Sequence, residues 1–167
     1  AFVSPTNGYL WFTNNCAWNS AVFRYDHKND ILEDCKEFYN QDGAKLSIAY
    51  VYYLKEDKKG NIWVATDAGP MQITRESINK GEFTFTQHKV PRNDGTNYAD
   101  YLLSGVCISC MYVDNNNRKW FGTTANGLYV IDSDNITTLA HFTKDNSKLL
   151  SDNISSLAFN ESTGEMY

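Results

Sequence analysis

The sequence lacks the features of membrane-spanning and nucleic-acid-binding chains. No apolar run approaches the roughly 18 residues of a transmembrane helix, and the first residues show no charged segment leading into an apolar one. Lys and Arg number 15 against 20 Asp and Glu, which gives a net charge of −5. Because phosphate binding draws on clustered cations, we expect no nucleic-acid partner and no direct membrane insertion. If the chain is exported, its signal peptide lies upstream.

Cysteine is scarce as well. Four cysteines in 167 residues are too few for a disulfide scaffold. Cys107 and Cys110 have the spacing of redox and zinc motifs, but they lie in the apolar run 106–113, so we interpret them as two buried thiols. No second pair completes a metal site, and we predict no metal and no cofactor. For Cys16 and Cys35 two interpretations stay open, a disulfide or two free thiols.

Catalytic signatures are missing too. The three histidines are isolated, and neither Gly-x-Ser-x-Gly nor a phosphate-binding loop accompanies them. Asp132-Ser-Asp-Asn135 has alternating carboxylates but lacks the glycine and the closing glutamate of a calcium loop, so we interpret it as a hairpin turn. We therefore predict a chain that is not an enzyme. Cleavage of glycosides by a carboxylate pair, which sequence alone does not locate, is the alternative.

Residues typical of β-sheets are abundant, among them four Trp, eleven Tyr and nine Phe. The clearest unit runs from Asp114 to Asp132. It predicts a strand over 119–123, a turn at Asn126-Gly127 and a return strand over 128–131, because Asn-Gly tolerates the positive φ of a tight hairpin. Gly122, inside the first strand, leaves room for a neighbouring backbone or ring to approach.

This unit recurs along the chain. Its aromatic position is occupied by Trp11, Trp63, Trp120 and Tyr167, spaced by 52, 57 and 47 residues. Periods of this length with about four short strands each are typical of propeller blades. The other recurring residues are Gly60, Thr66, Thr123, Gly127 and Gly164. A tryptophan that recurs once per blade is predicted to pack neighbouring sheets together.

Gly-Asn-Ile-Trp-Val-Ala-Thr and Lys-Trp-Phe-Gly-Thr-Thr-Ala-Asn-Gly-Leu-Tyr-Val resemble the repeat of two-component regulator propellers, the extracytoplasmic sensors of hybrid two-component systems in gut Bacteroidetes. Asn160-Glu-Ser-Thr-Gly-Glu-Met-Tyr is more similar to the propellers of the Por-type (type IX) secretion system. The resemblance implies a periplasmic or outer-membrane-associated location. It also implies either a sensor domain that responds to carbohydrate-derived ligands or an accessory that docks other proteins.

We expect an all-β fold, a partial β-propeller over 1–167 with about three four-stranded antiparallel blades. The approximate blades are 1–45, 46–100 and 101–150, and 151–167 starts a further one. A ring needs about four to eight blades, so we interpret the chain as a fragment. Remaining blades or self-association would then cover its open sheet edges.

The links between the predicted strands hold the candidate binding residues. Trp18, Tyr98 and Tyr101 do not recur, so they are candidates for a rim that binds a glycan or a protein; the alternative is that they fold back over an open blade edge. The link 91–105 is the longest, and long links are often functional. We further predict an outer strand over 31–39 with some helical character, an extended connection over 75–81, and an inner strand over 154–159.

Overall fold

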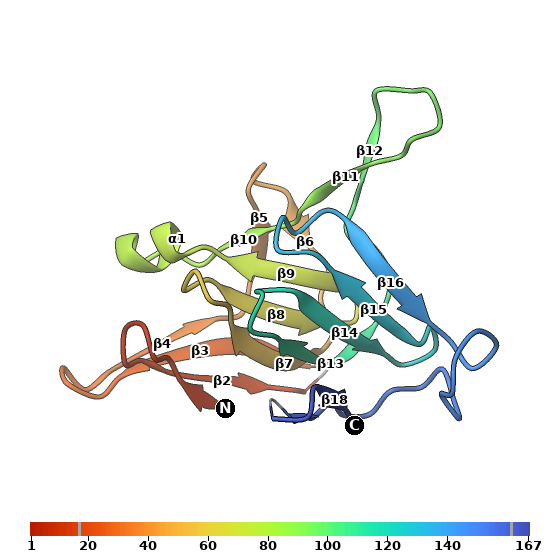
Figure 1. Cartoon of the computed structure of the whole chain (residues 1–167). Coiled ribbons are helices and arrows are strands. Elements are labelled where there is room, and N and C mark those ends of the chain that lie inside the picture. Colours follow the sequence, from red (N-terminus) through yellow and green to blue (C-terminus); the bar gives the residue numbers. More distant parts are fainter. Residues whose placement is uncertain (17, 161) are drawn as a thin grey trace.

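The computed structural model describes residues 1–16, 18–160 and 162–167. Figure 1 shows the chain as a row of twisted sheets that stand side by side, without closing into a ring. The expected all-β propeller class is confirmed. Within the described residues, the only helix is α1 (Arg75–Lys80).

The first blade is a four-stranded antiparallel sheet in chain order. Its strands are β1 (Phe2–Val3), β2 (Leu10–Asn14), β3 (Ala21–Asp26) and β4 (Ile31–Cys35). Trp11 pairs with Phe2 on one side and Arg24 on the other. β4 ends at Cys35, so the single strand predicted over 31–39 is wrong.

The second blade is longer at its outer edge than expected. It consists of β7 (Val51–Glu56), β8 (Ile62–Thr66), β9 (Gly69–Ile73) and β10 (Thr84–Thr86), extended by β5 (Phe38–Asn40) and β6 (Lys45–Leu46). β5 leaves the first blade and pairs parallel with β10. The ring of Phe38 packs 5.1 Å from that of Phe85. The strand predicted at 31–39 is therefore shared between two sheets.

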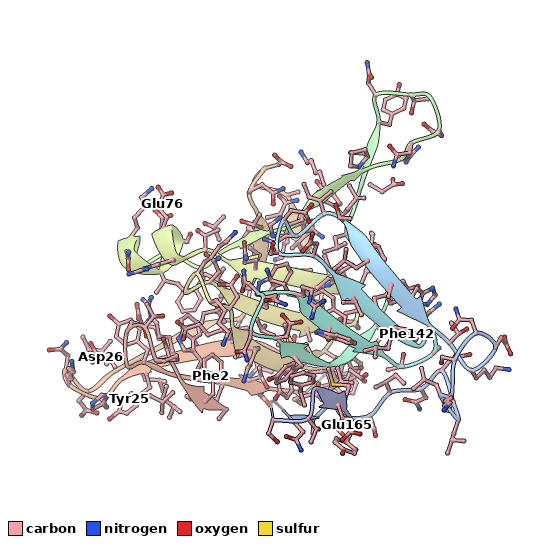
Figure 2. The ribbon with its side chains drawn as sticks, viewed as in Figure 1. Phe2, Tyr25, Asp26, Glu76, Phe142 and Glu165 are labelled. Atoms are coloured by element: carbon pink, nitrogen blue, oxygen red, sulfur yellow. The ribbon has the colours of Figure 1, made fainter. Side chains whose placement is uncertain are left out.

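Helix α1 connects β9 to β10, where an extended connection was predicted wrongly. The Thr74 hydroxyl accepts a hydrogen bond from the backbone N–H of Ser77, and Gly81 ends the helix with φ 77°. These are ordinary helix-capping residues. Figure 2 shows Glu76 on this helix, directed away from the sheets, and its carboxylate pairs with Lys80 at 2.7 Å.

The third blade is again four-stranded and antiparallel, with strands β13 (Ile108–Val113), β14 (Lys119–Thr123), β15 (Leu128–Ile131) and β16 (Thr138–Phe142). A two-stranded sheet follows, formed by β17 (Phe159–Asn160) and β18 (Glu165–Met166). The strand predicted over 154–159 is therefore mostly wrong. Ile154 instead donates its N–H to the Thr123 carbonyl at 2.8 Å, across the edge of the third blade.

The long link between the second and third blades folds into a hairpin of its own. Its strands are β11 (Lys89–Pro91) and β12 (Ala99–Tyr101). Figure 1 shows this hairpin projecting from the sheets in green, and we call residues 89–101 the arm. Because neighbouring strands are antiparallel, the arm leaves the blades at the same end as the β2–β3 connection. We call this end the arm face; of the described residues, it is formed by 15–16, 18–20, 67–68, 87–107 and 124–127.

The core lies between the blades. Trp11, Ile62 and Phe85 belong to the apolar cluster between the first and second blades, whereas Trp63, Met111 and Phe121 belong to the cluster between the second and third. We call these two contacts the first seam and the second seam. Aromatic rings fill both, and each fully buried ring removes about 150–250 Å² of surface from water.

Candidate functional site

The second and third blades each fix their tryptophan with an aspartate from the preceding turn. The Trp63 indole N–H donates to Asp57 Oδ2 at 3.1 Å, and the Trp120 indole N–H donates to Asp114 Oδ2, also at 3.1 Å. Burial alone would raise the pKa of Asp114, but hydrogen bonds from Trp120 and Arg118 outweigh it and lower this pKa. Sequence reasoning missed these aspartates, although an Asp stands six residues before both tryptophans.

The first blade departs from this pattern. Ser4 holds the place of the aspartate, since its N–H closes the turn onto the Tyr9 carbonyl at 2.8 Å. Among the described residues, the buried Trp11 Nε1 consequently has no hydrogen-bond partner. The positive φ of the turn is kept in all four repeats, three residues before the aromatic position: the residues are Gly8, Gly60, Asn117 and Gly164.

The recurring threonines close the hairpin at the arm face. Thr66 Oγ1 donates to the Gly69 carbonyl at 2.6 Å, and Thr123 Oγ1 donates to the Gly127 carbonyl at 2.8 Å. The turn at Asn126-Gly127 differs from the tight form predicted, because only Gly127 has a positive φ, 74°. Asn126 instead donates its N–H to Thr123 Oγ1 at 2.8 Å.

Two glycines admit close neighbours. A Cβ at Gly122 would lie 2.5 Å from Cys110 Sγ and 2.8 Å from Ile154 Cγ2. A Cβ at Gly127 would lie 2.1 Å from the Phe142 carbonyl oxygen. Gly69 of the second blade is similar, since its Cβ would lie 2.8 Å from the Leu103 carbonyl oxygen, so the space at these positions admits no side chain.

The exposure of the recurring aromatic residues increases along the chain. Trp11 and Trp63 are fully buried, Trp120 is half-buried and Tyr167 is 70% exposed. Trp63 packs on Phe121 of the next blade, with 5.6 Å between ring centres. Trp120 instead lines an open apolar groove of about 670 Å³. Other lining residues are Leu128, Phe142, Leu149, Ile154 and Tyr167.

The candidate binding residues have different environments. Trp18 is 95% exposed in the β2–β3 connection, and Tyr98 is 69% exposed on the arm. The fold therefore places both side chains in solvent on loops of the arm face. Tyr101 does not share this position, since it is only partly exposed and its hydroxyl donates to Asp42 Oδ2 at 3.3 Å.

Contacts at its base fix the arm to the second blade. Lys89 Nζ lies 3.1 Å from Asp42 Oδ2, the same oxygen that accepts from Tyr101. Leu102 is buried and donates its N–H to the His88 carbonyl at 2.8 Å. Further out, the Arg92 guanidinium forms a two-pronged ion pair with Asp100 at 2.9 and 2.6 Å. The arm is thus an ordered projection rather than a loose link.

The cysteines are four free thiols in this structure. Cys110 is buried as predicted, whereas Cys107 is only half-buried, because it precedes β13. Burial raises the pKa of Cys35 to about 11, which makes it an unreactive thiol. The disulfide between Cys16 and Cys35 is not formed. The described residues also contain no group of three or more His, Cys, Asp or Glu side chains placed to hold a metal ion.

No helix within the described ranges has the length and apolar character needed to cross a membrane.

Comparison with known proteins agrees with the resemblance read from the sequence. The family model "Two component regulator propeller" matches residues 45–68, which include Trp63 and Thr66. None of the curated proteins matches. PorZ, an essential surface component of the type-IX secretion system of Porphyromonas gingivalis, is 26% identical, with a TM-score of 0.85 over 99% of this chain.

Two extracellular domains from B. thetaiotaomicron share the fold. That of a hybrid two component system is 20% identical, with a TM-score of 0.65 over 98% of this chain. That of a one component system is 16% identical, with a TM-score of 0.66 over 96% of this chain. The present chain spans 24% of PorZ and 19% and 21% of these two domains, so it corresponds to a part of each.

Proposed function

We propose, from the two component regulator propeller repeat that this chain carries, that it is part of an extracytoplasmic β-propeller that binds a ligand and catalyses no reaction. The similar solved structures are extracellular domains and a surface component, which supports a location in the periplasm or at the outer membrane. Incubation with a panel of polysaccharides should release no new reducing ends. Release of such ends would favour glycoside cleavage.

The exposure of Trp18 is the observation that supports a binding role most strongly. This side chain is 95% exposed, whereas Trp11 and Trp63 are fully buried. Leaving an indole in water forgoes the stabilisation that burial of its surface would give. A ligand or partner that covers the ring recovers that stabilisation, and loops on a rigid scaffold are the usual place for such contacts.

The ligand we propose is a glycan. An exposed indole offers a flat apolar surface for the face of a sugar ring, and the arm carries hydrogen-bonding side chains of its own. Tyr98 lies on the arm close to Arg92, whose guanidinium carbon is 5.9 Å from the ring centre. The arm therefore offers both an aromatic ring and a cation. By family resemblance, the whole protein would convert glycan binding into a regulatory signal.

A glycan array tests this proposal. We expect the chain to bind at least one oligosaccharide, and we expect Trp18→Ala and Tyr98→Ala to weaken that binding without loss of fold. Tyr25→Ala is the matched control, because Tyr25 is a partly buried aromatic residue at the opposite end of β3. Equal binding by all three variants would show that the arm face does not bind the glycan.

A second candidate, an accessory of a type IX secretion system, is favoured by the identity to PorZ, which exceeds that to the two extracellular domains. In that role the arm face would dock a protein. Deletion of the gene in its source organism separates the two functions. Loss of type IX secretion would support the accessory, and loss of a transcriptional response to polysaccharides would support the sensor.

The apolar groove beside Trp120 calls for a partner in either case. We propose that further blades or a second copy of the chain cover it, because Trp120 stands where Trp63 packs on the following blade. Sedimentation analysis distinguishes these partners. A concentration-dependent dimer that Trp120→Ala abolishes would indicate self-association, whereas a monomer at all concentrations would indicate further blades.

A further inference from the structure

A lysine is completely buried in the second seam. Lys119, at the start of β14, is 0% exposed, and its Nζ donates to Asn135 Oδ1 at 2.5 Å. The nearest anionic group belongs to the other blade, since Asp57 Oδ2 lies 4.0 Å from Nζ and is equally buried. A charge pair thus bridges the two blades away from water.

An aromatic pair completes the cluster. The Nζ of Lys119 lies 5.4 Å from the centre of the Trp63 ring, a distance at which a cation is attracted to the π-system. His88 stacks on the same indole, with 5.2 Å between ring centres and 22° between the planes. The imidazole Nε2 lies 3.2 Å from Gln72 Oε1. One ring therefore contacts two basic side chains.

The first seam has no lysine at the corresponding place; its buried cation is Arg24, which is 5% exposed, lies 5.9 Å from the Trp11 ring centre and pairs with Glu33 of its own blade. The residue before Trp63 is Ile62, which is part of an apolar cluster, whereas the residue before Trp120 is Lys119. Replacing a buried ion pair by apolar residues is often neutral or stabilising. The buried pair is therefore weak evidence for a stabilising role of this lysine.

The charged groups around Lys119 shift its pKa in both directions. Asp57, Asp114 and Asp132 favour the ammonium, and Lys59 opposes it. The carboxylate of Asp57 has several other hydrogen-bond donors. It also accepts from Trp63 Nε1 and from the backbone N–H groups of Lys59 and Asn61. It consequently stays satisfied whether or not Lys119 carries a charge. Asp134 lies nearby in the β15–β16 turn; hydrogen bonds from Thr137 lower its pKa most, and the charge of Lys119 adds to this effect.

We propose that the cluster of Lys119, His88, Asp57 and Trp63 makes the second seam a pH-responsive contact, which loosens as it binds protons and tightens as it releases them. The first seam has Ile62 at the same place, and its buried cation is an arginine, a residue type that does not lose its charge in proteins, so this seam provides a contact without this response. The proposal concerns a conformational property of the propeller and is independent of which ligand the arm face binds.

The direction follows from the protonation of the two bases. Burial, outweighing the attraction of Asp57, lowers the pKa of Lys119 to about 8. Burial, together with the charge of Lys119, also lowers the pKa of His88. A base whose pKa is lower in the folded state binds protons more weakly there, so protons favour unfolding. Stability should rise between pH 8 and 10.5 through Lys119 and fall below about pH 6.5 through His88.

Two measurements on the full chain test the proposal. The first is an NMR titration of the histidine and lysine side chains. We expect the His88 midpoint to lie below the ordinary value and to rise in Lys119→Met, which removes the neighbouring charge. Lys55→Met is the matched control, because Lys55 is a partly buried lysine that pairs with Trp63 in the sheet but places its Nζ 6.0 Å from the Tyr112 ring centre, and it should leave the His88 midpoint unchanged.

The second measurement is urea unfolding between pH 7 and pH 10. The unfolding constant of the wild type, divided by that of Lys119→Met, should fall on the order of 50-fold over this range. If Lys119→Met fails to fold, two other measurements test the proposal: the titration of the lysine in the wild type and the acid stability of His88→Gln. We expect His88→Gln to lose less stability than the wild type below pH 6.5. An ordinary lysine midpoint near 10.5, or a pH-independent ratio, would overturn the proposal.

Discussion

Truncation of the recurring tryptophans should cost stability in proportion to their burial. For the fully buried Trp63, about 200 Å² of ring surface at about 25 cal/mol per Å² corresponds to roughly 5 kcal/mol, and large core truncations cost about 3–5 kcal/mol. Asp57 Oδ2 loses the indole donor, but it still accepts from Asn61 Nδ2 at 3.0 Å. We therefore expect Trp63→Ala to lower the free energy of unfolding by ~3–5 kcal/mol.

Truncation of the half-buried Trp120 should lower the free energy of unfolding by about half as much, ~1.5–2.5 kcal/mol. Trp18→Ala is the matched control, and at 95% exposure it should change stability by less than about 0.5 kcal/mol. Urea unfolding followed by circular dichroism measures all three variants, because that signal does not depend on a single indole. Equal losses for the buried and the exposed tryptophan would refute the packing role of the recurring residues.

Three further predictions concern a turn, a thiol and the arm. Gly127→Ala should destabilise the chain by more than about 1 kcal/mol, because its Cβ would lie 2.1 Å from the Phe142 carbonyl oxygen. Gly43→Ala is the control, since a Cβ there has nothing within 4 Å, and thermal unfolding should show a smaller loss of stability for it. Burial raises the pKa of Cys35 from 9.0 to about 11, so the contribution of this thiol to stability should be lost as pH rises above 9, opposing the gain through Lys119; Cys35→Ala should therefore be more stable relative to the wild type at pH 10 than at pH 8. Asp42→Asn should speed tryptic cleavage within the arm, since it weakens the contacts at the base; an unchanged cleavage rate would show that the backbone contacts suffice.

The repeated hairpins could be predicted from sequence because they depend on local residues. The strands predicted at 119–123 and 128–131 have those bounds in the structure. The periodic Trp and the positive-φ turns act within a few residues of each other, and sequence spacing reports such contacts directly. The aspartate that binds the indole of Trp63 or Trp120 has an equally local signal, an Asp six residues before the Trp, but the turn position alone does not indicate that its carboxylate accepts from the indole.

Contacts between sheets could not be predicted in this way. β5 pairs with β10 across the sequence, and nothing within residues 38–40 specifies a parallel partner more than forty residues away. Similarly, Lys119 was counted as an ordinary strand residue, because its burial depends on the neighbouring blade. The helix α1 is a different kind of error, since Thr74 and Gly81 did carry its capping signals.

The arm face, too, depends on tertiary structure. Trp18 and Tyr98 were both named from loop position alone, and both are exposed in the fold. Tyr101 was named for the same reason, but its hydroxyl contacts Asp42, in the turn between β5 and β6 of the second blade. Sequence can identify an aromatic residue outside the repeat, but it cannot tell a free ring from one that holds a hairpin in place.

The binding role of the arm face is tested most directly by the four tryptophan indole N–H signals in a nitrogen-edited NMR titration with an oligosaccharide that the chain binds. We predict that the Trp18 signal shifts with saturation, while the signals of the buried Trp11 and Trp63 stay in place. A saturating ligand that leaves Trp18 unmoved and shifts Trp120 would place binding in the apolar groove instead and contradict the account.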